Sequence, residues 1–255
     1  LLGGPLRPAW LDASVGPLLR RASAVGLAGL AYKLSALSGA FFVWQLDTAE
    51  ALGSFHAAHR LLGPLSEAAW LIAAPLLVSL SPLRGSDAPP FRALLTGHLR
   101  PLLAVAAILA LSASYLAPTV LQMLYGTRFV GADGSAVPLL AVLGLAGAMG
   151  LLTPMLVMAC LAQGRDRWLL TVAVSGLLVG WLANALLVPT QGALGAMHAL
   201  CVGEAMVLLL LAVAAVRCGD LRVDAHWLPC LLPALLLLPV LEALRHHPLS
   251  QLFVT

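Results

Sequence analysis

Long apolar runs separated by short polar segments dominate the pattern of the chain. Most of these runs are longer than the ~20 residues that a helix needs to cross a bilayer core of roughly 30 Å. The pattern therefore predicts an all-α bundle of transmembrane helices, about seven spans in total. The expected spans are 19–46, 54–80, 101–124, 138–162, 168–188, 193–216 and 226–244, of which the last is short and rich in proline.

Composition strengthens this interpretation. The chain is 61% hydrophobic and only 10% charged, whereas a soluble domain is about 25% charged. The net charge of +3 comes without a basic run or an aromatic-interleaved patch, so we expect no nucleic-acid partner. The four cysteines lack CxxC spacing, which argues against a disulfide framework, a metal site or a bound cofactor.

The arginines indicate an orientation, because cytoplasmic loops of membrane proteins carry an excess of Lys and Arg. If the N-terminus lies in the cytoplasm, most of them fall on the cytoplasmic side, and an odd number of spans leaves the C-terminus outside. The cytoplasmic set is Arg7, Arg20, Arg21, Arg84, Arg92, Arg100, Arg165, Arg167, Arg217 and Arg222, and the outer set is Arg60, Arg128 and Arg245.

The chain divides into three parts. Residues 1–18 are expected to form a cytoplasmic loop or interfacial segment, 19–216 a six-helix transmembrane lobe, and 217–255 a cytoplasmic linker with an additional transmembrane helix. Residues 84–100 form the most polar linker within the lobe. The first residue is leucine and no signal sequence follows it, so we expect the chain to lack its true N-terminus.

Lys33 is the one full charge near the middle of the first span. Such a group is expensive in a membrane and marks a candidate functional site. Six residues lie within about 40–60° of it on a helical wheel, and most are small, which suits close helix packing or a cavity wall. A lysine that snorkels or pairs with a carboxylate for structural reasons is the alternative. The six are Ala22, Gly26, Gly29, Ala36, Leu37 and Ala40.

The second span carries another polar face. His56, Arg60, Glu67 and Trp70 share it by helical phase, so they are candidates for lining a substrate pathway. The alternative places His56 and Arg60 in the membrane interface. Glu67 lies deeper, within the apolar run.

Glu204 lies near the middle of the sixth span, off the small-residue ridge of Gly195, Ala199 and Gly203. A carboxylate at this depth is a candidate proton or cation site, as is Glu67. The alternative for Glu204 is a protonated or hydrogen-bonded structural residue.

Asn184 shares a face with a GxxxG pair in the fifth span, so we expect it to hydrogen-bond between helices. The sequence contains no GKS/T loop, no HExxH and no GxSxG, and the expected protein is not an enzyme.

Several short motifs occur in a consistent order. The segments are ALGSFHAAHRLL at 51–62, LYGTRF at 124–129, LAQGRDR at 161–167, NALLVPTQGALG at 184–195, and Gly203-Glu204 in the next helix. Tyr32-Lys33-Leu34-Ser35 resembles a Y-[RK]-[IL]-D motif in the first helix of a transporter lobe. Over residues 19–216 the chain resembles the Wzx-type oligosaccharide flippases of the multidrug/oligosaccharidyl-lipid/polysaccharide exporter superfamily, specifically helices seven to thirteen of fourteen.

The resemblance implies polysaccharide export in the bacterial inner membrane. Its cargo would be an oligosaccharide linked to undecaprenyl pyrophosphate, moved to the outer leaflet by alternating access. Lys33 would pair with the anionic group, and Glu67 or Glu204 would bind a coupling proton or sodium ion. The missing N-terminal lobe would be a partner, as would the lipid bilayer.

Two positions depart from the family pattern. Ser35 replaces an aspartate and Gly180 an asparagine, which places ion coupling in question more than the fold. Three alternatives remain: a lipid II flippase, a multidrug exporter of the same superfamily, and a membrane enzyme of glycan assembly. A degenerate scaffold that does not transport is a further alternative.

Overall fold

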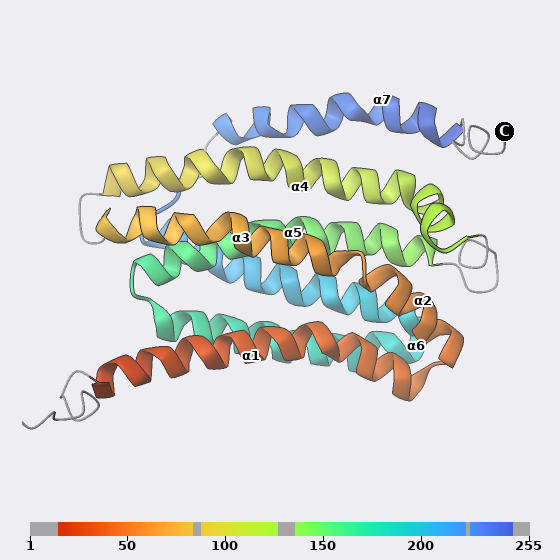
Figure 1. Ribbon diagram of the computed structural model, residues 1–255, viewed down its shortest axis with the longest axis horizontal. Helices are drawn as coiled ribbons and strands as arrows, with labels where there is room; N and C mark the ends of the chain where they lie inside the picture. Colours follow the sequence, from red (N-terminus) through yellow and green to blue (C-terminus); the bar gives the residue numbers. More distant parts are fainter. Residues whose placement is uncertain (1–14, 84–87, 127–135, 223–224, 247–255) are drawn as a thin grey trace, which may run out of the picture.

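The computed structural model describes residues 15–83, 88–126, 136–222 and 225–246, and every element in these ranges is a helix (Figure 1). The prediction of an all-α bundle is confirmed. The elements are α1 (Val15–Leu46), α2 (Ala49–His59), α3 (Leu62–Leu80), η2 (Ser81–Leu83), α4 (Ala88–Tyr125), α5 (Val137–Ala162), α6 (Asp166–Arg217), η4 (Ala225–Leu231) and α7 (Leu232–His246).

The chain is a polytopic membrane protein by the length and apolarity of its helices. Five helical stretches in the described ranges are long and apolar enough to cross a bilayer. Successive helices run in opposite directions through the bundle (Figure 1). The bundle therefore has two ends, and we call the end that contains the start of α1 and the α5–α6 turn the arginine end. Its described arginines are Arg20, Arg21, Arg92, Arg165, Arg167, Arg217 and Arg222.

The longest helix, α6, is a hairpin of two arms, residues 166–191 and 193–217. Gly192 separates them with non-helical backbone angles, φ 57° and ψ −138°. A Cβ atom on Gly176 would lie 2.3 Å from Val207 Cγ2, and one on Gly195 would lie 2.3 Å from the Leu187 carbonyl oxygen. Such close approach of the arms depends on residues without side chains. The arms correspond to the predicted fifth and sixth spans.

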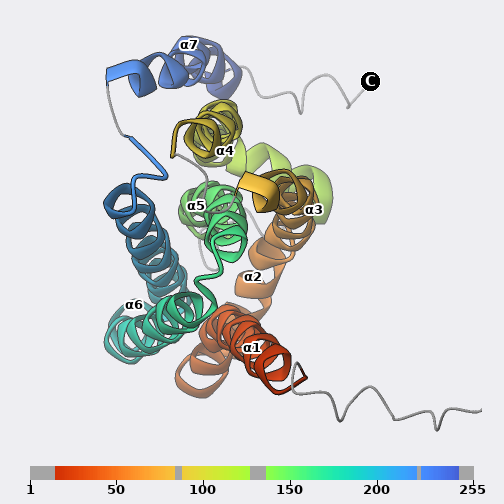
Figure 2. The ribbon, with the colours of Figure 1, turned by 90° about the vertical axis from the view of Figure 1, so that its left-hand side faces the viewer.

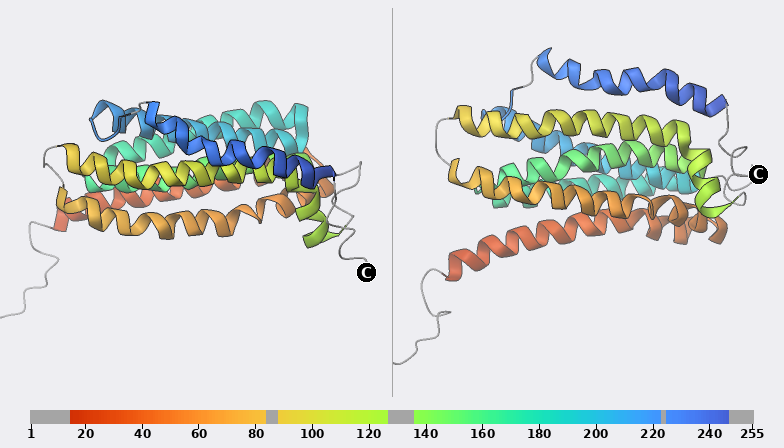
Figure 3. Two further views of the ribbon diagram at one scale, coloured as in Figure 1. Left: turned by 90° about the horizontal axis from the view of Figure 1, so that it is seen from above. Right: turned by 45° about the horizontal axis from the view of Figure 1, so that its top comes forward.

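The helix α5 lies at the centre of the bundle, with α2, α3, α4 and α6 around it (Figure 2). α3 and α4 pack against α5, while α1 packs mainly against α6. α1 and α7 lie on opposite sides of the bundle (Figure 3). The close contacts again use small residues, since a Cβ on Gly144 of α5 would lie 2.2 Å from Ala113 Cβ of α4.

Four boundaries differ from the prediction. α1 begins at Val15, within the predicted loop, and the predicted seventh span is divided into η4 and the short helix α7. The second span is broken, because α2 ends at His59 and α3 begins at Leu62. The expected linker at 84–100 is wrong from Ala88 onward, because α4 begins there. Phe91, Leu95 and Leu99 lie at helical spacing on one buried face, and this packing holds the segment in a helix. Residues 1–14, 84–87, 127–135, 223–224 and 247–255 lie outside the described ranges, as do the predictions made for them.

Ion pairs join the turns at the arginine end. Arg21 of α1 pairs with Asp166 at the start of α6. Arg165 Nη1 lies 2.7 Å from Asp220 Oδ2, and Gln163 Nε2 donates to Asp220 Oδ1 at 3.2 Å. Asp166 and Asp220 are buried, so these bonds fix the start of α6 and the segment after it to the rest of the bundle.

Asp47 holds the opposite end together. Its Oδ2 accepts a hydrogen bond from the Ala193 amide at 2.9 Å, and its Oδ1 accepts one from the Thr48 amide at 2.7 Å. The carboxylate therefore caps the second arm of α6 from the α1–α2 turn. A Cβ on Gly192 would lie 2.4 Å from Asp47 Oδ2, so the turn needs glycine both for this contact and for its positive φ.

Candidate functional site

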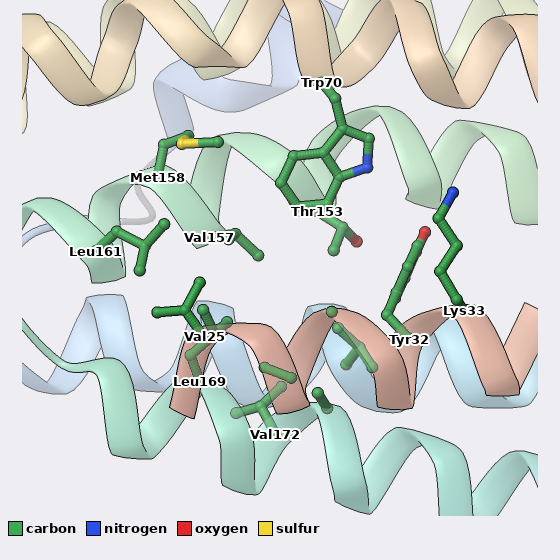
Figure 4. Close-up of a pocket in the computed structure, with 14 residues that line it drawn as sticks. Val25, Tyr32, Lys33, Trp70, Thr153, Val157, Met158, Leu161, Leu169 and Val172 are labelled. Atoms are coloured by element: carbon green, nitrogen blue, oxygen red, sulfur yellow. The ribbon is translucent and has the colours of Figure 1, made fainter. Parts of the chain in front are cut away.

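A cavity of about 310 Å³ lies between α1, α3, α5 and α6 (Figure 4). Most of its wall is apolar, and polar side chains reach it at one end, near the middle of the bundle. The wall includes Val25, Tyr32 and Lys33 of α1, Trp70 of α3, Thr153 and Met158 of α5, and Val172 of α6.

Lys33 and Glu67 meet between α1 and α3. Lys33 Nζ lies 3.3 Å from Glu67 Oε1, and the side chains are 68% and 67% exposed. The Lys33–Glu67 ion pair is therefore open on one side. The helices that carry it, α1 and α3, also flank the cavity. In Figure 4 the Lys33 amine points away from α1 toward the α3 side.

Glu204 reaches the same region from α6. Its carboxylate lies close to the Tyr32 hydroxyl, and Tyr32 also lies close to the Ser66 side chain. Glu204 Oε2 is buried and has no hydrogen-bond partner. A buried carboxylate oxygen without a donor is costly, so this position suits a proton or a bound cation.

The two pairs form one cluster at a common depth. Lys33 and Glu67 lie near the centres of their membrane-spanning stretches, and Glu204 lies near the middle of the second arm of α6. Tyr32 and Lys33 are consecutive on α1, so this helix supplies one residue to each pair. The Tyr32 ring also packs edge-on against Trp70, with ring centroids 6.4 Å apart.

The small residues near Lys33 line open space rather than a helix contact. A Cβ on Gly26 or Gly29 would meet nothing within 4 Å, and Gly29 borders the cavity. Of the six residues predicted to share this face, Gly29 lines the cavity, while Ala22, Gly26 and Leu37 are exposed. The contact with α6 uses the neighbouring face of α1, where Ala24, Ala28 and Ala31 are buried.

Asn184 lies at the α1–α6 contact, away from the cavity. Its Nδ2 donates to Ser38 Oγ at 3.2 Å and to the Gly180 carbonyl at 2.8 Å. The side chain is almost completely buried. Asn184 thus makes a hydrogen bond between helices, which is the packing role predicted for it.

His56 and Arg60 do not join the cluster. Both are exposed, and neither lines the cavity. The helix break between Arg60 and Leu62 ends the continuous helical phase on which the shared face was based. Figure 1 shows α2 at the end of the bundle opposite the arginine end, as expected for residues near a membrane interface.

Tyr32 and Ser66 are the site residues that sequence reasoning missed. Each sits next to a charged residue that it had identified, but a tyrosine and a serine within apolar runs have many structural uses. The approach of Tyr32 to Glu204 and to Ser66 depends on the packing of three helices and leaves no local sequence signal.

Comparisons with protein-family models, with curated proteins and with solved structures find no match to this chain. In the described ranges no group of three His, Cys, Asp or Glu side chains could hold a metal ion. The fold and site define a multi-pass helical membrane protein that carries a charged cluster beside an interior cavity.

Proposed function

We propose that the chain is a lobe of a membrane transporter that moves a lipid-linked oligosaccharide across the bacterial inner membrane for polysaccharide biosynthesis. The single observation that carries the proposal is the meeting of Lys33, Glu67 and Glu204 at mid-membrane depth beside a cavity. Ionisable residues in this position mark transport pathways more often than structural packing. The family resemblance of residues 19–216 supports the same function.

The exposure of the Lys33–Glu67 pair supports a pathway. A charged side chain at the bilayer centre costs about 2.5–3.5 kcal/mol even on the most permissive scale. An open pair at this depth is therefore better placed against water or another protein surface than against lipid tails. A second lobe, facing α1 and α3, would complete an aqueous pathway around the pair.

The cluster supports an exchange of the anion that pairs with Lys33. A pyrophosphate group that enters the pathway competes with Glu67 for the Lys33 ammonium, because both are oxygen anions. When the anion binds Lys33, Glu67 loses its partner and becomes a site for a proton or a sodium ion. Glu204 lies close to Tyr32, and its buried Oε2 has no hydrogen-bond partner, so it is a second site for the coupling ion.

Orientation follows from the distribution of charge. The arginine end would face the cytoplasm, with α1 starting there. The cargo would then travel from the arginine end toward the Asp47 end, as export from the inner to the outer leaflet requires.

A second candidate is the extrusion of lipophilic compounds, which the mostly apolar cavity wall favours. Such cargo would bind to Trp70, Tyr32 and Met158 and would not need the Lys33 ammonium. The two functions therefore differ in their dependence on Lys33.

Lys33→Ala in the complete protein tests the proposal. We expect at least a tenfold loss in the transfer of lipid-linked oligosaccharide in proteoliposomes, because the ammonium that binds the anion is removed. A tenfold loss corresponds to about 1.4 kcal/mol of interaction free energy. Lys33→Arg should keep most of the activity, and Leu34→Ala, an exposed neighbour, should keep all of it. Normal oligosaccharide transfer by Lys33→Ala would exclude the proposed role, and drug efflux that persists in this variant would favour the second candidate.

A further inference from the structure

A second cavity, of about 750 Å³, lies at the arginine end, and the proposed transport cycle does not use it. It is formed where the first turns of α1 meet the turn between α5 and α6. Small residues leave the space open, and arginines line it. The lining residues are Gly16, Arg20, Arg21 and Ala24 of α1, together with residues 164–168.

The cavity carries uncompensated positive charge. Two of its arginines have acidic partners, since Arg21 pairs with Asp166 and Arg165 with Asp220. In the part of the chain that the structure describes, Arg20 and Arg167 have no such partner. Both are exposed. Two guanidinium groups thus remain available, and this group binds phosphate oxygens in a bidentate manner.

The first arm of α6 adds to the positive electrostatic potential of this cavity. Its N-cap residue, Arg165, makes no side-chain capping bond, and the helix starts at the wall of the cavity. The N-terminal amides of a long helix carry partial positive charge and favour an anion. Asp166 offsets part of this field, but Arg21 already neutralises that carboxylate.

The surroundings fit a ligand with both a phosphate and a hydrocarbon chain. Trp168, at the rim, is 38% exposed, and tryptophan is typical of the membrane interface. The apolar cavity begins one position further along both helices, at Val25 of α1 and Leu169 of α6. A headgroup at the arginines would therefore lie beside apolar walls.

We propose that this cavity binds the phosphate group of an anionic lipid at the cytoplasmic surface of the membrane. Basic pockets between transmembrane helices on this side bind lipid headgroups in general. The phosphate could be supplied by a glycerophospholipid of the bilayer or by a polyprenyl diphosphate. Lys33 does not line this cavity, so binding here does not require the Lys33 ammonium.

The experiment measures binding to the purified complete protein in detergent. Phosphatidylglycerol, a polyprenyl diphosphate and neutral phosphatidylcholine are each added, and thermal stability and native mass spectra are recorded. The test variant is Arg20→Gln with Arg167→Gln. The matched control is Arg217→Gln with Arg222→Gln, which removes the same charge from exposed arginines at the same end but outside the cavity.

We expect at least one of the two phosphate lipids to bind and stabilise the wild type, and phosphatidylcholine to have no effect. Affinity should fall at least tenfold in the test variant and stay within twofold in the control. The lipid that binds identifies the source of the phosphate. The proposal is overturned if neither lipid binds, if phosphatidylcholine binds equally well, or if the control loses as much affinity as the test variant.

Discussion

At the scale of single residues, Ser35 and Gly180 lie at one place, the crossing of α1 and α6. Ser35 Oγ would lie 3.3 Å from a Cβ on Gly180 and 3.7 Å from one on Gly203. None of these three residues is ionisable. The proposed coupling therefore depends on Lys33, Glu67 and Glu204.

Gly192 is the single residue on which the α6 hairpin most depends. Gly192→Ala should lower stability by about 1–3 kcal/mol, because it forces a side chain into a left-handed backbone conformation and against Asp47 Oδ2. The measurement is the thermal unfolding midpoint in detergent. Gly150→Ala is the control, since its Cβ meets nothing within 4 Å and the change should leave the midpoint unchanged or higher. Equal midpoints for Gly192→Ala and wild type would contradict the argument.

At the scale of elements, the apolar runs predicted the membrane-spanning helices because span length is set by bilayer thickness and needs no tertiary information. The start of α4 was missed because its helical structure does depend on tertiary contacts. Arg92, Thr96 and His98 interrupt the apolar residues of this segment. The packing of its apolar face, Phe91, Leu95 and Leu99, depends on the neighbouring helices.

The candidate site was also predicted only in part. Lys33, Glu67 and Glu204 were identified individually, because each is ionisable within an apolar run. Their meeting could not be predicted, since it depends on how α1, α3 and α6 rotate against one another. The inclusion of His56 and Arg60 failed because helical phase does not continue across a break in the helix.

Replacing Asp220 tests whether its ion pair and hydrogen bond stabilise the turns at the arginine end. Asp220→Ala should destabilise the protein by about 1–3 kcal/mol, because Gln163 and the half-buried Arg165 lose their acceptor. Chemical unfolding in detergent micelles measures the change. Glu50→Ala removes the same charge from an exposed helix start and should cost below about 1 kcal/mol. A smaller loss for Asp220→Ala than for Glu50→Ala would show that this network does not hold the turns.

At the scale of the whole molecule, the native cysteines offer a test of orientation. Cys218 is exposed at the arginine end, while Cys160 and Cys201 are buried. With Cys230→Ser, a membrane-impermeant maleimide should label Cys218 from the cytoplasmic side only. Thr48→Cys, at the exposed opposite end, should be labelled from the outside. Labelling in the reverse pattern would invert the proposed direction of transport.

The pairing of α1 with α6 has a consequence for how the protein is made. Arg21–Asp166, Ser38–Asn184 and Asp47–Ala193 each join residues 145 or 146 positions apart. At about 5–20 residues per second, a ribosome needs roughly 7–30 s to synthesise the intervening chain. During that interval the nascent α1, with Lys33 in its middle, has not met its partner. We therefore expect α1 to stay near the insertion machinery until α6 has been synthesised.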